Sequence, residues 1–177
     1  QDVVNVADVV FVTTTDDAIR PVTNAQKWRT GQTVVHCAGA NSLDVLDSAT
    51  RYGAMTGAMH PLLAFSSIEN GYRSIPGTTF GIEADGETRE YLNTLVYSIG
   101  GTPVDISSED KALYHLTGVM MGGLLTTLGA TVAQLWENLG LTRSEGVQAL
   151  VPMMKSVSNN LETVGLPQAV AGPYMRG

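Results

Sequence analysis

Residues 7–17 read Ala-Asp-Val-Val-Phe-Val-Thr-Thr-Thr-Asp-Asp, and this stretch decides the fold class. The apolar, β-branched run at residues 7–12 is typical of a strand that is buried on both faces of a sheet. The acidic residues after it predict a helix that continues to about Lys27, because carboxylates are favourable near the positive end of a helix dipole. A buried strand followed directly by a helix indicates a parallel α/β protein.

The same alternation of strand and helix continues to about residue 106. Further strands are predicted at 33–37, 54–59, 78–83 and 103–106, helices at 41–52 and 87–99, and a loop at 65–76. After residue 107 the pattern is helical, with one long helix to about Leu139 and another from Thr142 to about Val164. This order predicts an α/β domain at residues 1–106 and an all-α domain at residues 107–177.

Charge and cysteine content exclude some classes of function. The 177 residues carry a formal net charge of −7 and include a single cysteine, Cys37. A nucleic-acid partner is not expected, because phosphate binding needs a surplus of lysine and arginine. One cysteine allows no disulfide within the chain, and residues 1–11 show no signal-peptide pattern. We therefore expect a cytoplasmic protein.

Residues 116–135 carry no charge and are long enough to cross a bilayer. Gly118 and Gly122 form a GxxxG pair within this run. Four glycines, four threonines and one glutamine dilute its apolar content, and no aromatic belt flanks it. We expect a buried helix of a soluble protein here and no contact with a membrane.

A doubly wound nucleotide-binding sheet opens with a strand, a G-x-G-x-x-G turn and a helix. None of the nineteen glycines forms such a turn after a strand. The first explanation is that the chain is the later part of a Rossmann-like sheet, with the fingerprint upstream of residue 1. The other is that the fold binds no dinucleotide.

Several short stretches resemble, in order, a bacterial family with a Rossmann-like domain followed by a helical domain of unknown function. They are residues 7–12, 16–19, 35–40, 59–62, 64–65, 76–82, 110–115 and 171–177. That family is similar to pyrroline-5-carboxylate reductase and to the deazaflavin-dependent NADP reductases. The resemblance implies further residues upstream, NADP or NAD as the cofactor, and a homodimer formed through the helical domain.

Two functions are consistent with this resemblance. The first is an NAD(P)-dependent oxidoreductase that transfers hydride to a small carbonyl or imine substrate. The alternative is a non-catalytic nucleotide- or metabolite-binding protein that acts through a helical dimer. In the family that the chain resembles, the long helix often carries Ser-Asn where this sequence has Gly122-Gly123, and this departure favours the alternative.

Two turns follow predicted strands at the edge of the sheet where open α/β sheets bind ligands. Threonine hydroxyls in the first turn are candidates for lining the ribose or nicotinamide, although they also suit helix capping. Small residues in the second turn permit close approach of a flat ring, although they also suit a tight turn. The candidate cofactor-binding residues are Thr13, Thr14, Thr15, Ala38, Gly39 and Ala40.

Two histidines are candidate catalytic residues. His60 follows the third predicted strand, where an imidazole can donate a proton to the group being reduced. His115 lies early in the long helix beside Tyr114 and is a candidate general acid. A buried structural role is the alternative for both, and His36 is predicted to be structural. No metal site is predicted, because the histidines lack ligand spacing.

Overall fold

The computed structural model describes residues 2–170 and residue 172. The chain divides into two compact units, Gln1–Gly122 and Gly123–Gly177, and each is considered separately. The last stretch of the family resemblance, residues 171–177, lies outside the described residues, apart from Gly172. The same holds for Arg176, which by its sequence alone is a candidate for binding a phosphate or carboxylate.

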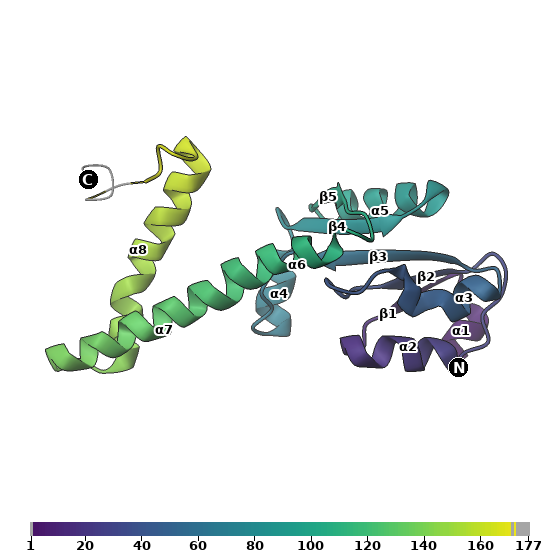
Figure 1. Cartoon of the computed structure of the whole chain (residues 1–177), viewed down its shortest axis with the longest axis horizontal. Helices are drawn as coiled ribbons and strands as arrows, with labels where there is room; N and C mark the ends of the chain where they lie inside the picture. The colour runs from purple at the N-terminus through teal and green to yellow at the C-terminus, as the bar shows by residue number, and fades with distance from the viewer. Residues whose placement is uncertain (1, 171, 173–177) are drawn as a thin grey trace. The chain divides into compact units, whose positions relative to one another are not determined.

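The first unit is built on a five-stranded sheet with the strand order β1-β2-β3-β4-β5 (Figure 1). Strands β1, β2 and β3 run parallel to one another, as do β4 and β5. The predicted parallel-dominated α/β fold is therefore confirmed. The strands are β1 (Val9–Val12), β2 (Thr33–His36), β3 (Met55–Pro61), β4 (Thr79–Ala84) and β5 (Thr102–Asp105).

Strands β3 and β4 pair antiparallel, which the strand pattern did not reveal. The chain turns back after β3, so that the Leu62 N–H donates to the Thr79 carbonyl at 2.8 Å. The connection predicted as a loop contains a short helix, α4 (Ile68–Ser74), whose N-terminal Ser67 side chain accepts from the Asn70 N–H. Parallel pairing would need a crossover that carries the chain back to the end of the sheet at which β3 begins.

Helices cover both faces of the sheet. Helices α2 and α3 lie on one face, and α5 lies on the other (Figure 1). The helix predicted at residues 41–52 is divided into a 3-10 turn and a short α-helix. The helical elements of this unit are α1 (Asp2–Val6), α2 (Asp16–Asn24), η1 (Leu43–Leu46), α3 (Asp47–Arg51), α4, α5 (Gly86–Ser98) and α6 (Lys111–Val119).

The sequence did not predict α1, which precedes β1. Gln32 holds its end, because the buried Gln32 amide nitrogen donates to the carbonyls of Val4 at 2.7 Å and Ala7 at 2.9 Å. These carbonyls have no partner within a helix that ends there. A contact between residues 28 positions apart therefore stabilises a helix too short to persist alone.

Two hydrophobic clusters pack on the sheet. The cluster with α2 and α3 contains Val10, Val12, Ile19, Trp28, Val34, Leu46 and Ala49. The cluster with α5 contains Val35, Phe80, Ile82, Ala84, Leu92 and Val96. Because β1 and β2 contribute residues to both clusters, these strands are buried on both faces, as their continuous apolar runs predict.

The long helix of the prediction is present, but the chain itself does not bury it. It runs over Lys111–Leu139 as α6, a π-helical turn η2 (Met120–Leu124), α7 (Leu125–Leu135) and a 3-10 turn η3 (Trp136–Leu139). Within the part of the chain that the structure describes, this is the one helix whose length and apolar composition would allow it to span a membrane. Only 6% of its most apolar 18-residue stretch is buried. The expectation of a buried helix is therefore wrong for the chain alone, because the sheet covers only its first turns.

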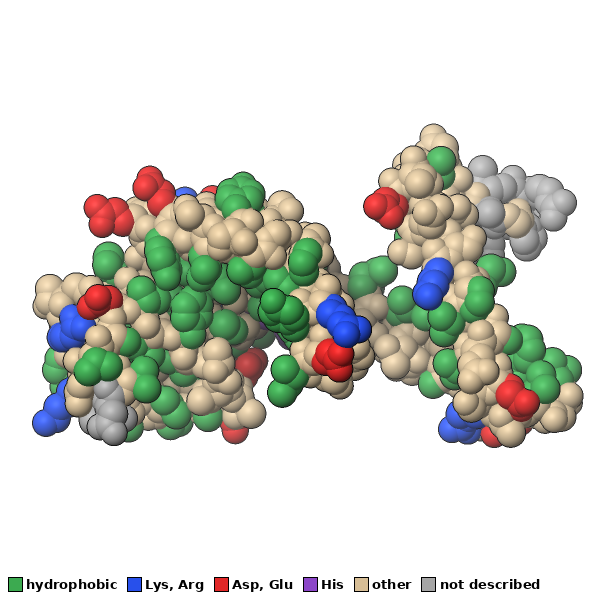
Figure 2. Space-filling view, turned by 180° about the vertical axis from the view of Figure 1, so that it is seen from behind, with side chains coloured by type: hydrophobic (Ala, Val, Ile, Leu, Met, Phe, Trp, Pro, Cys, Tyr) green, Lys and Arg blue, Asp and Glu red, His purple; other side chains and the backbone are tan. Residues whose placement is uncertain are grey.

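The second unit is a helical hairpin of α7 and α8 (Arg143–Val164). Gly140, at φ 81°, ends the first helix, and Thr142 and Glu145 begin the second with reciprocal capping hydrogen bonds. Gly146 allows close packing, because a Cβ there would lie 2.9 Å from the Ala133 carbonyl oxygen. Hydrophobic side chains remain exposed over these helices (Figure 2).

Candidate functional site

Helix α6 packs against β4 and against Leu62, the residue that follows β3, through positions three and four residues apart. Lys111 pairs with Glu83, the Tyr114 ring covers Gly81, and Gly118 lies against Leu62. This spacing places the three α6 residues on one helix face. These contacts join α6 to the sheet, and the first compact unit accordingly extends to Gly122.

Tyr114 fixes the end of β3. Its hydroxyl lies 3.1 Å from the Gly81 N–H, 3.1 Å from the His60 carbonyl oxygen and 3.1 Å from His60 Nδ1. Gly81 makes room for it, because a Cβ there would lie 2.6 Å from the Tyr114 ring. One phenol thus holds both the backbone and the side chain of His60.

These contacts assign the tautomer of His60. A carbonyl oxygen can only accept, so Tyr114 donates its single hydroxyl hydrogen to the His60 carbonyl. The hydroxyl oxygen then accepts from Gly81 and from Nδ1–H of His60. Nε2 of His60 is left as a hydrogen-bond acceptor.

Gly39 lies between the two candidate catalytic histidines. A Cβ on Gly39 would lie 2.7 Å from Nε2 of His60 and 2.2 Å from Nδ1 of His115. The two rings are 5.5 Å apart between centroids, and Nδ1 of His115 is buried without a hydrogen-bond partner among the described residues. Two imidazole nitrogens thus converge at the turn after β2, where the sequence predicted a close ligand approach.

Burial keeps two histidines of this region uncharged at neutral pH. Burial, followed by the charges of His115 and Lys111, lowers the pKa of His60 to about 4. Burial and the charge of Lys111 also lower the pKa of His36 to about 4. His36 is fully buried at the end of β2, where its Nδ1 accepts from the Ala38 N–H at 3.1 Å. The His60 ring is therefore uncharged at neutral pH.

We expect the free energy of unfolding to fall as the pH drops from about 6.5 to about 4, because unfolded His36 then binds a proton that folded His36 does not. Above pH 6.5, His36 causes no change in the free energy of unfolding with pH. The loss is roughly 3 kcal/mol, at about 1.4 kcal/mol per unit of pKa difference. Urea unfolding across this range checks it. His36→Asn keeps an acceptor for Ala38 without titrating, so its curve should be flatter; parallel curves would contradict the assignment.

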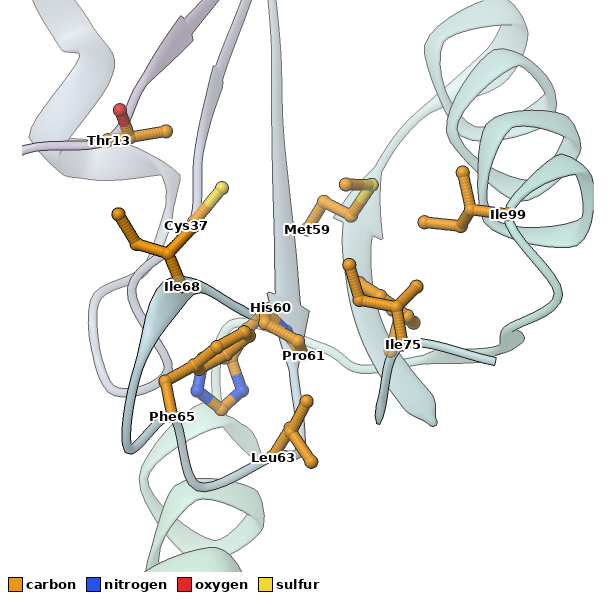
Figure 3. A pocket seen from close by; sticks show the side chains of 11 residues that line it. Thr13, Cys37, Met59, His60, Pro61, Leu63, Phe65, Ile68, Ile75 and Ile99 are labelled. Carbon is orange, nitrogen blue, oxygen red and sulfur yellow. The ribbon is translucent and has the colours of Figure 1, made fainter. Parts of the chain in front are cut away.

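A cavity of about 770 Å³ opens at the carboxyl ends of β1, β2 and β3. Its polar side chains are Thr13, Cys37 and His60, and burial raises the pKa of the Cys37 thiol. Figure 3 shows Thr13 and Cys37 at neighbouring strand ends, with His60 and Phe65 among the other side chains that line the cavity. The remaining lining residues are apolar: Met59, Pro61, Leu63, Phe65, Ile68, Ile75, Phe80 and Ile99.

A buried ion pair adjoins this cavity, and the sequence did not point to it. The side chains of Lys111 and Glu83 are 2% and 7% exposed, with Nζ 3.6 Å from Oε2. Lys111 also donates to the Ala38 carbonyl at 3.4 Å. A usable signal existed, because Lys111 precedes His115 by one helical turn and so shares its face. Glu83 ends an apolar strand and gave no such signal.

Only some of the predicted cofactor-binding residues lie at the cavity or at the two histidines. Thr13 lines the cavity, whereas Thr14 and Thr15 are exposed, and Thr15 precedes α2 without a side-chain capping bond. Ala38 is buried and Gly39 lies between the histidines, whereas Ala40 is exposed. Within residues 2–170 and residue 172, no three histidine, cysteine, aspartate or glutamate side chains are grouped to hold a metal ion.

The fold matches known families over nearly its whole length. Residues 1–61 match the Rossmann-like domain, and residues 78–177 match the Domain of unknown function (DUF2520). The chain belongs to the DUF2520 family. This confirms the two-domain resemblance stated from the sequence. The comparison with curated proteins gave no match.

Solved structures share the fold of this chain. Protein TM1727 from Thermotoga maritima is 26% identical, with a TM-score of 0.80, and the match covers 97% of this chain and 65% of that one. Pyrroline-5-carboxylate reductase from Streptococcus pyogenes is 15% identical, with a TM-score of 0.71 and coverages of 99% and 63%. Plasmodium falciparum pyrroline carboxylate reductase with NADP bound is 12% identical, with a TM-score of 0.69, and the match covers 95% of this chain and 64% of that one.

The DUF2520 chain therefore has the fold of Rossmann-type reductases and spans about two thirds of the length of these proteins. At 12% and 15% identity, the likeness to the two pyrroline carboxylate reductases shows the fold alone. The chemistry of this chain has to be argued from its own residues.

Proposed function

We propose that this chain belongs to an NAD(P)-dependent oxidoreductase that transfers hydride to a small carbonyl or imine substrate. The observation that carries the proposal is the convergence of His60 Nε2 and His115 Nδ1 on Gly39, beside a cavity at the strand ends. Pyrroline carboxylate reductases with this fold include one with NADP bound, which supports the choice of cofactor. NADP or NAD would supply the hydride when bound.

The residues at the strand ends fit a nicotinamide-type ligand. Gly39 is buried, and its N–H forms no hydrogen bond with the described residues. Buried backbone N–H groups are almost always paired in folded proteins, so this donor favours a bound acceptor. Thr13 and Cys37 would face the same ligand from the neighbouring strand ends, since both line the cavity.

The two histidines would divide the proton chemistry. His60 is uncharged at neutral pH and presents Nε2 as an acceptor, so it would orient the reacting hydroxyl or amine by accepting a hydrogen bond from it. His115, whose Nδ1 has no described partner, would donate the proton during reduction. This differs from the sequence-based prediction, in which His60 was a proton donor.

Titration of the complete gene product with NADPH and NADH, followed by nucleotide fluorescence, tests the proposal. We expect saturable binding of at least one nucleotide, and nucleotide oxidation with a set of small ketones and cyclic imines. His115→Phe should bind nucleotide normally but lose about 100-fold in turnover, the usual contribution of a general acid. A folded protein that binds neither nucleotide would refute the proposal.

The alternative function, a non-catalytic nucleotide- or metabolite-binding protein, is favoured by one feature of the long helix. Gly122 and Gly123 lie in the π-helical turn, where related sequences often place Ser-Asn. The same titration separates the two functions. Nucleotide binding without turnover of any carbonyl or imine, and with no effect of His115→Phe, would support the alternative.

We also propose that the protein is a cytoplasmic homodimer formed through the long helix. Leucine and methionine side chains of α6, η2 and α7 are exposed in the single chain, and covering them with a second copy would remove apolar area from water. They include Leu113, Leu116, Met121, Leu124 and Leu128.

Light scattering after size exclusion, without detergent, checks the dimer. We expect twice the subunit mass for the complete gene product, and a shift toward monomer for Leu128→Asp, since Leu128 is 60% exposed in the single chain. Ile68→Asp, at an apolar position on α4 that is 94% exposed, serves as the control and should leave the mass unchanged. A monomeric wild-type protein, or one soluble only in detergent, would contradict the proposal.

A further inference from the structure

Lys111 and Glu83 form a buried ion pair that the proposed chemistry does not use. Removing two charges from water costs several kcal/mol per ion before their attraction is counted. A pair of apolar residues in the same place is often equally stable or more stable. Stability therefore gives a weak reason for this pair, and its contacts show what else it does.

Glu83 collects hydrogen bonds from two separate loops. Its Oε1 accepts from the Leu43 N–H at 3.4 Å and from the Ser108 hydroxyl. Its Oε2 pairs with Lys111. One carboxylate on β4 thus ties the loop after β2 to the loop that leads into α6.

Lys111 links the Glu83 carboxylate to the peptide between Ala38 and Gly39. Its Nζ donates to the Ala38 carbonyl, which lies one bond from the Gly39 nitrogen. That peptide is trans, so its carbonyl and its N–H point in opposite directions. Because Lys111 holds the carbonyl, the Gly39 N–H must point away from the ion pair, and it is the donor without a partner among the described residues.

We infer that Lys111 and Glu83 are positioning residues that hold the Ala38–Gly39 peptide so that the buried Gly39 N–H faces the carbonyl or amide oxygen of a ligand at the strand ends. The inference rests on the proposed function, in which that ligand is a nicotinamide nucleotide. The pair acts on the ligand only through the peptide, since neither side chain lines the cavity.

The double variant Lys111→Met/Glu83→Gln of the complete gene product separates positioning from stability. It removes both charges together, so we expect the melting temperature to stay near that of the wild type. NADPH should nevertheless bind about tenfold more weakly, the effect of losing one well-placed hydrogen bond. The matched control is Arg73→Gln/Glu69→Gln, which removes a mostly exposed ion pair and should change neither quantity.

Hydrogen exchange of the Gly39 amide, measured by NMR in the wild-type protein, tests the same inference without a variant. We expect unprotected exchange in the free protein and clear protection after NADP+ is added. Protection in the free protein, or no change on binding, would overturn the inference, as would a folded double variant that binds NADPH as the wild type does. In these cases the wild type still binds NADPH, so the proposed function stands; a wild type that binds no nucleotide overturns both.

Discussion

Replacing Gly39 with alanine should abolish most turnover while leaving the fold intact. The new methyl group would lie 2.2 Å from Nδ1 of His115 and 2.7 Å from Nε2 of His60, so both rings must move. Because side-chain rings yield more easily than backbone, the chain should still fold. A displacement of this size at reacting groups typically lowers the rate by about 100-fold.

Steady-state kinetics on the most active carbonyl or imine substrate, together with thermal unfolding, measures both parts of this prediction. Gly129→Ala is a suitable control, because that glycine is helical and its nearest neighbour, Met154 Sδ, would be 3.9 Å from the added Cβ. The control should keep full turnover. An active Gly39→Ala enzyme would show that the reaction takes place elsewhere.

Lys111→Met alone should destabilise the protein by about 3–5 kcal/mol, the usual cost of leaving one member of a buried ion pair without its partner. Glu83 would then be a buried carboxylate that keeps its bonds from Ser108 and Leu43 but faces no cation. Chemical denaturation at neutral pH measures the loss.

Adding Glu83→Gln to that variant should recover most of the lost stability, because the uncompensated charge is removed. A double-mutant cycle with the two single variants gives the coupling between Lys111 and Glu83. If the single variant is as stable as the wild type, the charge of Lys111 does not stabilise the buried Glu83 carboxylate.

The candidate site was only partly visible in the sequence. His60 and Gly39 each follow a predicted strand, so both could be placed at the same edge of the sheet. The sequence could not show that His115 reaches Gly39, because this depends on the direction in which α6 crosses β4. Tyr114 and Gly81 decide that direction, and they lie 33 residues apart.

The sequence by itself determined the α/β character, the succession of strands along the chain and the extent of the long helix. These follow from local apolar periodicity and from turn residues, which act within a few positions of one another. Only the tertiary structure decided the antiparallel pairing of β3 with β4, the burial of Lys111 against Glu83 and the neutral state of His60. Each of these depends on residues distant in sequence excluding water from a shared space, and no local pattern encodes that.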